Sequence, residues 1–277
     1  MPFLHIVILA AVQGLTEFLP ISSTAHLRLV TLSTGWPDQG LVMDVAVHVG
    51  TLFAVILYFW RDLWRMVMSL ANRFSRSAAK RRTDDDFWLA IKLIVATLPT
   101  IGAGLWVDQY VTTELRTLEV IAWATLGFAV LLYFADQANM TVKRMNHIGL
   151  LGALFIGIFQ VLALIPGTSR AGITMTAARF MGVERHDAAR FSMLLSIPVI
   201  IGAGVLKGSQ LYRAGDAQLT SDAFTAAGLA FLFALVAIAL LMQWLKRASF
   251  TPFVLYRVIL GGLLLYVAYW APGLLPG

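Results

Sequence analysis

Six apolar stretches, each close to the length of a membrane-spanning helix, constrain the fold of this chain more than any other feature. A helix needs about 20 mostly apolar residues to cross the hydrocarbon core of a bilayer. The stretches comprise 41–59, 88–106, 118–135, 188–206, 223–243 and 253–271. They predict an all-α polytopic membrane protein, which we expect to form a single integral membrane domain over residues 1–277.

Composition argues against the main soluble classes of protein. Only 13% of the 277 residues are charged and 59% are hydrophobic, whereas a soluble domain has roughly 25% charged residues. So apolar a chain does not suit a soluble enzyme, a disordered protein or a nucleic-acid-binding protein, even with a net charge of +6. The absence of cysteine excludes disulfides, thiolate metal sites and cysteine nucleophiles.

Two shorter apolar stretches are interrupted by polar residues and prolines. Residues 2–12 run into a stretch that contains Glu17 and Pro20, and 148–165 is followed by Pro-Gly-Thr-Ser-Arg at 166–170. Polar, irregular backbone is tolerated at membrane depth only where it is buried in protein or lines a wet cavity. We therefore expect both stretches to form re-entrant segments, which enter and leave the membrane on the same side.

Basic residues are concentrated in alternate loops. Loop 60–87 carries the densest group of arginines and lysines, and 136–147 and 244–252 each carry a further basic pair. The intervening loops 107–117 and 207–222 mix both signs of charge. Because basic loops tend to stay in the cytoplasm, this pattern predicts three cytoplasmic loops and places both termini on the opposite side of the membrane.

The two halves of the chain, about 1–140 and 147–277, each consist of one re-entrant segment followed by three spans. Three is an odd number, so the second half would enter from the opposite side, which is an inverted-topology repeat. The sequence at 19–23, Leu-Pro-Ile-Ser-Ser, is similar to Ile-Pro-Gly-Thr-Ser at 165–169. We expect the two re-entrant tips to meet near the membrane midplane, where such folds bind their substrates.

Three residues at these tips are ionisable, and ionisable residues at membrane depth are functional candidates because their burial is costly. Glu17 and His26 lie in the first tip and Arg170 lies in the second. Hydroxyl and amide side chains surround them in the sequence: Gln13, Ser22, Ser23, Thr24, Thr168 and Ser169.

Together these residue types suit phosphoryl transfer, in which positioning and charge neutralisation provide most of the catalysis. Arg170 can bind a phosphate through two hydrogen bonds, and the hydroxyls and helix-start amides can bind its other oxygens. His26 can act as an acid or a base near neutral pH, and Ser23 is a candidate nucleophile. Glu17, with Gln13, can hold a divalent cation through oxygen atoms, or Glu17 can activate a hydroxyl or a water.

Each of these residues also has a simpler structural interpretation. Serines after a proline are often helix caps, and a single histidine at membrane depth is more often a hydrogen-bonded structural residue, as we expect for His48. Inverted repeats are also typical of transporters, so a polyprenyl-phosphate flippase or secondary transporter is the alternative to an enzyme, and a structural membrane protein is a third option. The convergence of Glu17, His26 and Arg170 at two matched chain breaks favours the enzyme.

At these residues the chain resembles the undecaprenyl-diphosphate phosphatase family of bacterial inner membranes, which is associated with bacitracin resistance. Residues 13–26, Gln-Gly-Leu-Thr-Glu-Phe-Leu-Pro-Ile-Ser-Ser-Thr-Ala-His, are similar to the family's first motif. Residues 163–172, Ala-Leu-Ile-Pro-Gly-Thr-Ser-Arg-Ala-Gly, are similar to the second. The likeness extends over essentially the whole chain, although Gln13 stands where many members have Glu, Ala25 where they have Gly, and Ala171 where they have Ser.

The resemblance implies a hydrolase that converts undecaprenyl diphosphate to undecaprenyl phosphate, the lipid carrier for cell-wall synthesis, and so confers bacitracin resistance. It implies a multi-pass protein of the bacterial inner membrane, with its active site open to the periplasm, where the topology also places both termini. The partners implied are the polyprenyl diphosphate substrate and membrane lipids, with both a monomer and a homodimer compatible. The cofactor implied is a divalent cation, Mg²⁺ or Ca²⁺.

The family's functional positions fall on particular residues of this chain. The catalytic positions are Glu17, Ser23, His26 and Arg170. The phosphate-binding positions are Ser22, Thr24, Thr168, Ser169 and Arg170, and the metal-binding positions are Glu17 and Gln13. Attack on phosphorus by Ser23 and attack by water are both compatible with this set.

Overall fold

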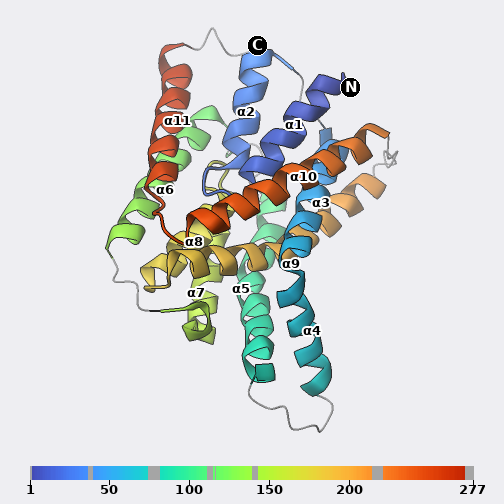
Figure 1. Ribbon diagram of the computed structural model, residues 1–277. Coiled ribbons are helices and arrows are strands. Elements are labelled where there is room, and N and C mark those ends of the chain that lie inside the picture. The colour runs from blue at the N-terminus through green and yellow to red at the C-terminus, as the bar shows by residue number, and fades with distance from the viewer. Residues whose placement is uncertain are drawn as a thin grey trace.

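The computed structural model describes residues 2–36, 40–73, 82–110, 115, 117–138, 143–213 and 221–271. Within these residues the secondary structure is helical, apart from one isolated bridge between Lys143 and Val183. The helices, labelled in Figure 1, are α1 (Phe3–Thr16), α2 (Ser23–Thr34), α3 (Gly40–Tyr58), α4 (Trp60–Arg73), α5 (Arg82–Tyr110), α6 (Leu118–Gln137), α7 (Leu150–Val161), α8 (Arg170–Phe180), α9 (Arg185–Arg213), α10 (Ser221–Trp244) and α11 (Thr251–Trp270), with short 3-10 helices η2 (Met145–His147) and η3 (Leu162–Leu164).

Six of the described helices are long and apolar enough to cross a membrane, which confirms the predicted spans. They are α3, α5, α6, α9, α10 and α11. Their outer faces carry large exposed apolar side chains such as Leu240, Ile259 and Trp270. A surface of this kind would be unfavourable in water but suits contact with lipid.

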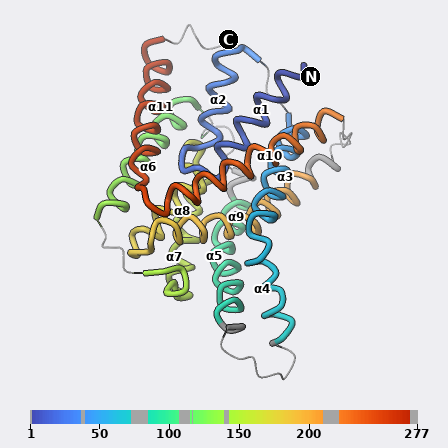
Figure 2. The backbone as a smooth tube through the Cα atoms, in the orientation of Figure 1, coloured from blue at the N-terminus to red at the C-terminus, as the bar shows by residue number. Residues whose placement is uncertain are grey.

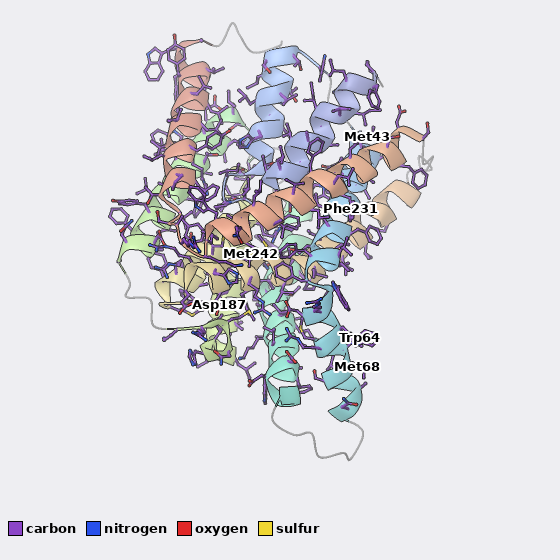
Figure 3. All side chains as sticks on the ribbon, in the orientation of Figure 1. Met43, Trp64, Met68, Asp187, Phe231 and Met242 are labelled. Atoms are coloured by element: carbon purple, nitrogen blue, oxygen red, sulfur yellow. The ribbon has the colours of Figure 1, made fainter. Side chains whose placement is uncertain are left out.

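The segment predicted as the cytoplasmic loop 60–87 is largely helical, which corrects that part of the prediction. Residues Trp60–Arg73 form α4 and α5 already begins at Arg82, whereas most of the basic cluster between them lies outside the described residues. Apolar residues recur on α4 at helical spacing, as Trp64 and Met68 do in Figure 3, and this periodicity favours an amphipathic helix rather than a loop.

The two predicted re-entrant segments each form a helix, a turn and a second helix. The first helices, α1 and α7, have 14 and 12 residues and are too short to span a bilayer. The second helices, α2 and α8, begin after serines with left-handed φ, 72° at Ser22 and 68° at Ser169. The two turns thus share an unusual backbone conformation, while the inverted orientation of the two halves stays a prediction.

Both short helices pack closely on the backbone of a spanning helix. α1 lies against α10, and α7 lies against α5. A Cβ atom on Gly14 would come within 2.7 Å of the Ala230 carbonyl oxygen, and one on Gly157 would overlap the Ala96 carbonyl oxygen. Small residues permit this close approach of helix backbones. In Figure 2 the tube of α11 runs beside that of α6, a pairing that forms another extensive contact.

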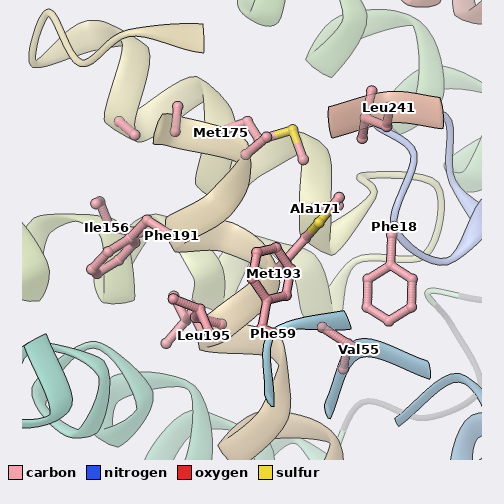
Figure 4. Packing of buried hydrophobic residues seen from close by; sticks show 14 of the residues in the cluster. Phe18, Val55, Phe59, Ile156, Ala171, Met175, Phe191, Met193, Leu195 and Leu241 are labelled. Atoms are coloured by element: carbon pink, nitrogen blue, oxygen red, sulfur yellow. The ribbon is translucent and has the colours of Figure 1, made fainter. Parts of the chain in front are cut away.

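The largest apolar core surrounds α8. Residues of α3, α7, α8, α9 and α10 meet there, among them Val55, Ile156, Met175, Phe191, Met193 and Leu241 (Figure 4). Because α8 is enclosed on all sides, its first residue, Arg170, is held at a fixed place inside the molecule.

A buried ionic cluster joins the far end of α8 to three other segments. Asp136, at the end of α6, accepts hydrogen bonds from Nε of Arg179 (3.0 Å), Nε of Arg185 (2.8 Å) and the Phe250 amide (3.2 Å). The Asp136 and Arg179 side chains are each 1% exposed. This cluster therefore fixes α6, α8, the start of α9 and the loop before α11 relative to one another.

Candidate active site

The carboxylate of Glu17 is the centre of the site. Its Oε1 lies 3.1 Å from Nη2 of Arg170, so the structure brings the two predicted tips together. Its Oε2 accepts hydrogen bonds from Nε2 of Gln13 (2.9 Å) and Oγ of Ser23 (3.2 Å). Four of the predicted residues, from both motifs, are thus linked through one carboxylate.

The positions of the two charges on their helices disfavour a purely structural role. Glu17 is the C-cap of α1, and Arg170 is the first residue of α8. A helix dipole favours cations at the C-terminus and anions at the N-terminus, so each charge lies at the unfavourable end. Their side chains are only 9% and 12% exposed. The pair therefore depends on mutual attraction, which a charged ligand can replace.

The Arg170 guanidinium is held in place by protein contacts and also borders a cavity. Its Nη1 donates to the Ser192 carbonyl oxygen at 3.4 Å, and its Cζ lies 5.8 Å from the centre of the Phe18 ring. It also lines a cavity. Arg170 can therefore present the N–H donors of its planar guanidinium to an oxyanion.

Two helix N-termini start at this cavity. Oγ of Ser22 accepts from the Ala25 amide, and Oγ of Ser169 accepts from the Gly172 amide, so each serine is an N-cap. The structural interpretation of these serines as caps is thus correct, but both also line the cavity, as does Thr24. Thr168 is buried, and its Oγ1 has no hydrogen-bond partner in the described part of the chain. First-turn amides and a helix dipole favour an anion here.

The cavity has a polar end and an apolar remainder. Its volume is about 520 Å³. Glu17 and Arg170 lie at the polar end with the serine and threonine hydroxyls. The remainder is lined largely by aliphatic side chains of α3, α9 and the turn before α8, namely Val45, Val49, Leu52, Leu164, Ile165, Val199, Ile200 and Val205. Such a cavity suits a ligand with a charged head and an apolar chain.

His48 belongs to this site, although we expected it to be only structural. Its Nδ1 donates to the Asp44 carbonyl oxygen (2.7 Å), so its Nε2 accepts from Nε2 of Gln13 (3.2 Å), and the ring lines the cavity. Asp44 also forms an ion pair with Lys207, another lining residue. The sequence signal was a histidine four residues after an aspartate inside a span, where both are costly.

His26 is not brought to the Glu17 carboxylate. Its Nδ1 donates to the Ser22 carbonyl oxygen (2.7 Å), its Nε2 lies 2.5 Å from the Tyr256 hydroxyl, and the two rings are stacked. The ring is absent from the cavity lining among the described residues. The left-handed turn at Ser22 directs this face of α2 towards α11, so the acid or base role of His26 stays a prediction.

Comparison with known proteins identifies the family. A family model described as "Bacitracin resistance protein BacA" matches residues 6–263. The chain belongs to the BacA family. It is 49% identical to the Undecaprenyl-diphosphatase of Roseobacter denitrificans, over 97% of this chain and 100% of that protein. It is 47% identical to Undecaprenyl-diphosphatase 1 of Rhodospirillum rubrum, over 100% and 99% of the two chains.

The side chains at this BacA-family site fit a divalent cation only if the substrate supplies part of its coordination. No group of three or more histidines or carboxylates among the described residues could hold a metal. Glu17 is the one carboxylate among the described cavity-lining residues, and Oε1 of Gln13 is buried without a hydrogen-bond partner there. Mg²⁺ is commonly bound by one or two carboxylates together with substrate phosphates. These two oxygen donors fit that arrangement.

Proposed function

We propose that this protein is a membrane-embedded undecaprenyl diphosphatase, which hydrolyses undecaprenyl diphosphate to undecaprenyl phosphate and inorganic phosphate. The observation that carries this function is the Glu17–Arg170 pair in a cavity whose lining also includes many aliphatic side chains. The names of the relatives agree with a phosphatase, and the flippase or transporter alternative is not favoured. In bacteria, this activity recycles the carrier lipid of cell-wall synthesis and confers bacitracin resistance.

The diphosphate binds at the polar end of the cavity, and the polyprenyl chain follows the aliphatic lining between α3 and α9. Arg170 forms charge-assisted hydrogen bonds to the terminal phosphate. The hydroxyls of Ser22, Thr24 and Ser169 and the first-turn amides of α2 and α8 contact the remaining oxygens. Thr168 supports this set from inside the second turn.

Substrate binding also prepares the base. When Arg170 donates to phosphate oxygens instead of to Glu17, the Glu17 carboxylate loses its charged partner. It still accepts the hydrogen bond from Ser23 at 3.2 Å. Ser23 Oγ then attacks the terminal phosphorus as its proton passes to Glu17, and the bond to the bridging oxygen breaks to release undecaprenyl phosphate. Glu17 passes that proton to the departing undecaprenyl phosphate and is a base again when water attacks the phosphoserine. It then returns the proton of the water to Oγ of Ser23 as inorganic phosphate leaves.

Attack by a cavity water on the lipid diphosphate, with Glu17 as the base, is the second candidate for the chemical step. The existing hydrogen bond from Ser23 to Glu17 supports the serine route. Acid quenching during turnover of radiolabelled substrate distinguishes the two, because only the serine route leaves labelled phosphate on the protein.

A divalent cation, Mg²⁺ or Ca²⁺, fits this site as a partner of the diphosphate. Glu17 and the Oε1 of Gln13 are the protein oxygens that would hold it. When bound, it would neutralise charge on the phosphate oxygens.

We propose that the active site and both termini face the periplasm of the bacterial inner membrane. The start of α1 and the end of α11 lie towards one end of the molecule, and the α4–α5 hairpin towards the other (Figure 1). The basic loop at Lys246 precedes Phe250, which bonds to the buried Asp136 cluster.

Ser33→Cys and Lys246→Cys test this orientation, because the native chain has no cysteine. An impermeant maleimide should label Ser33→Cys in intact cells and Lys246→Cys only after the inner membrane is opened; the reverse pattern would invert the topology.

The function itself is tested with purified full-length protein and undecaprenyl diphosphate in detergent. Wild-type protein should release inorganic phosphate, and Arg170→Ala should lose the activity. A matched control is Arg144→Ala, which removes an exposed arginine outside the site. Movement of the labelled lipid across sealed vesicles without phosphate release would instead support the flippase.

A further inference from the structure

Arg257 is a fully buried arginine in the middle of α11, and its partners are backbone carbonyls rather than a carboxylate. Its Nε donates to the Thr125 carbonyl oxygen at 3.1 Å, and its Nη2 donates to those of Gly167 (3.1 Å) and Thr168 (3.0 Å). Its Nη1 donates to the Pro20 carbonyl oxygen at 3.4 Å. No carboxylate in the described part of the chain forms an ion pair with it.

Burying a charged guanidinium without a carboxylate partner destabilises the folded protein, so its retention suggests a specific role. Removing an ion from water costs several kcal/mol even after the protein relaxes, and Arg257 is 0% exposed. If this position served only to pack α11 against its neighbours, an apolar side chain would be sufficient. The guanidinium, however, has five donors in a fixed plane, so it can hold several carbonyls at once.

The carbonyls that it holds belong to both tips of the site. Pro20 lies two residues before Ser22, and Thr168 lies directly before Ser169. Each of these serines has a left-handed φ. That conformation is strained for a non-glycine residue and persists only where the surroundings enforce it. Arg257 provides such enforcement for two turns that are almost 150 residues apart in the sequence.

We propose that Arg257 is a positioning residue, which keeps the two serine turns in their phosphate-binding conformation and in register with each other. This inference rests on the proposed function. Peptide planarity makes the carbonyl of Thr168 and the amide of Ser169 point in opposite directions. Holding that carbonyl therefore aims the Ser169 amide away from Arg257, and the same contact set fixes the first tip through Pro20.

A second observation points to the same guanidinium. A Cβ atom on Gly172 would lie 3.0 Å from Nη1 of Arg257 and 3.2 Å from Oγ of Ser169. The absent side chain at this position thus leaves room for Arg257 beside the first turn of α8. Gly172→Ala therefore crowds the guanidinium and the Ser169 hydroxyl without changing any charge, and serves as a supporting probe.

The test uses full-length protein with Arg257→Lys, Arg257→Met and Gly172→Ala. Lysine keeps the charge but has a single ammonium, which cannot reach both turns and α6; methionine keeps much of the apolar volume. Arg179→Lys is the matched control, because Arg179 is equally buried but bonds to the Asp136 cluster. The readouts are kcat and KM for phosphate release, and amide hydrogen exchange at both turns and along α10.

We expect both Arg257 variants to lower kcat about 100-fold, the loss that follows a displacement of reacting groups by about 1 Å. KM should change much less, because Arg170 and the apolar lining are intact. Exchange should accelerate at 21–25 and 167–172 but not along α10. Gly172→Ala should show the same pattern more weakly, and Arg179→Lys should not show it.

Wild-type kcat and unchanged exchange at the turns in Arg257→Lys would overturn the inference. So would accelerated exchange throughout the protein, with a kcat that falls only with the folded fraction. If Arg257→Met does not fold, Arg257→Lys and Gly172→Ala still decide the matter. Absence of phosphate release by the wild-type protein would refute the proposed function separately, and the exchange data would still show whether Arg257 holds the turns.

Discussion

Replacing Glu17 by glutamine tests the centre of the site with the smallest change of shape. Three donors converge on this carboxylate: Arg170 on Oε1, and Gln13 and Ser23 on Oε2. A glutamine has one oxygen and one NH₂ group. If the NH₂ faces Arg170, donor meets donor and that contact becomes repulsive. If it faces Ser23 and Gln13, it can donate to the serine hydroxyl or to the Gln13 amide oxygen, and Arg170 then bonds to a neutral oxygen instead of a carboxylate.

Two effects of Glu17→Gln can be separated. Loss of a general base typically lowers the rate by 10²–10⁴-fold, and we expect kcat to fall by about that much. The folded state also loses a charge-assisted hydrogen bond to Arg170, which contributes about 1.5–3 kcal/mol where such bonds are intact. The Arg170 side chain is 12% exposed and next to a cavity, so the lower end of this range applies.

The assay combines initial rates of phosphate release with thermal unfolding in the same detergent. Glu184→Gln is a suitable control, because the exposed Glu184 side chain lies outside the site and forms a long ion pair with Arg144 at 3.9 Å. That control should retain wild-type kcat and stability. A Glu17→Gln protein that is folded and keeps kcat within tenfold of wild type would refute the role of Glu17 as base.

Three further predictions follow from particular contacts. Ser23→Ala should lower kcat at least about 100-fold and abolish acid-stable phosphate labelling of the protein; labelling that persists would assign the nucleophile elsewhere. His26→Phe keeps the stack on Tyr256 but removes both ring nitrogens, and we expect a lower kcat with an unchanged pH–rate profile, because these nitrogens contact the Ser22 carbonyl and a phenol; loss of one arm of the profile would show proton transfer by His26. Asp136→Asn should destabilise the fold by about 3–5 kcal/mol, since it removes the carboxylate that pairs with the buried Arg179, and unfolding curves that match the wild type would contradict this.

Much of the fold followed from the lengths of apolar stretches in the sequence. The six spans are set by local composition, so their existence and approximate bounds are predictable from a window of about 20 residues. α4 was missed because its amphipathic pattern lies next to a dense basic segment, and the charges dominated the interpretation of 60–87 as a loop. Its apolar residues at helical spacing carried the necessary signal.

The site was predictable to the extent that its residues lie in two local motifs. Glu17, Ser23 and Arg170 are brought together as those motifs suggested, whereas the direction in which His26 points depends on the backbone at Ser22. Arg257 could have been named as a functional candidate for the same reason as Glu17, because it too is an ionisable residue inside an apolar stretch. Its partners are up to 237 residues away in the sequence, so its role required the tertiary structure.

In the proposed mechanism, the charges at this site couple the activation of the base to the presence of substrate. Without substrate, Arg170 and Glu17 neutralise each other, which makes a buried pair tolerable and keeps the carboxylate engaged with the guanidinium. A diphosphate competes for Arg170 and in doing so releases the carboxylate beside the hydroxyl that it must deprotonate. The freed negative charge then lies close to turns held by Arg257, whose own charge has no carboxylate partner among the described residues. Because Arg257 is bound by neutral backbone carbonyls, it can stay in place while Arg170 moves from Glu17 to the phosphate. If Arg257 were instead paired with a carboxylate, any movement of Arg257 towards the substrate would leave a second unpaired anion in the site.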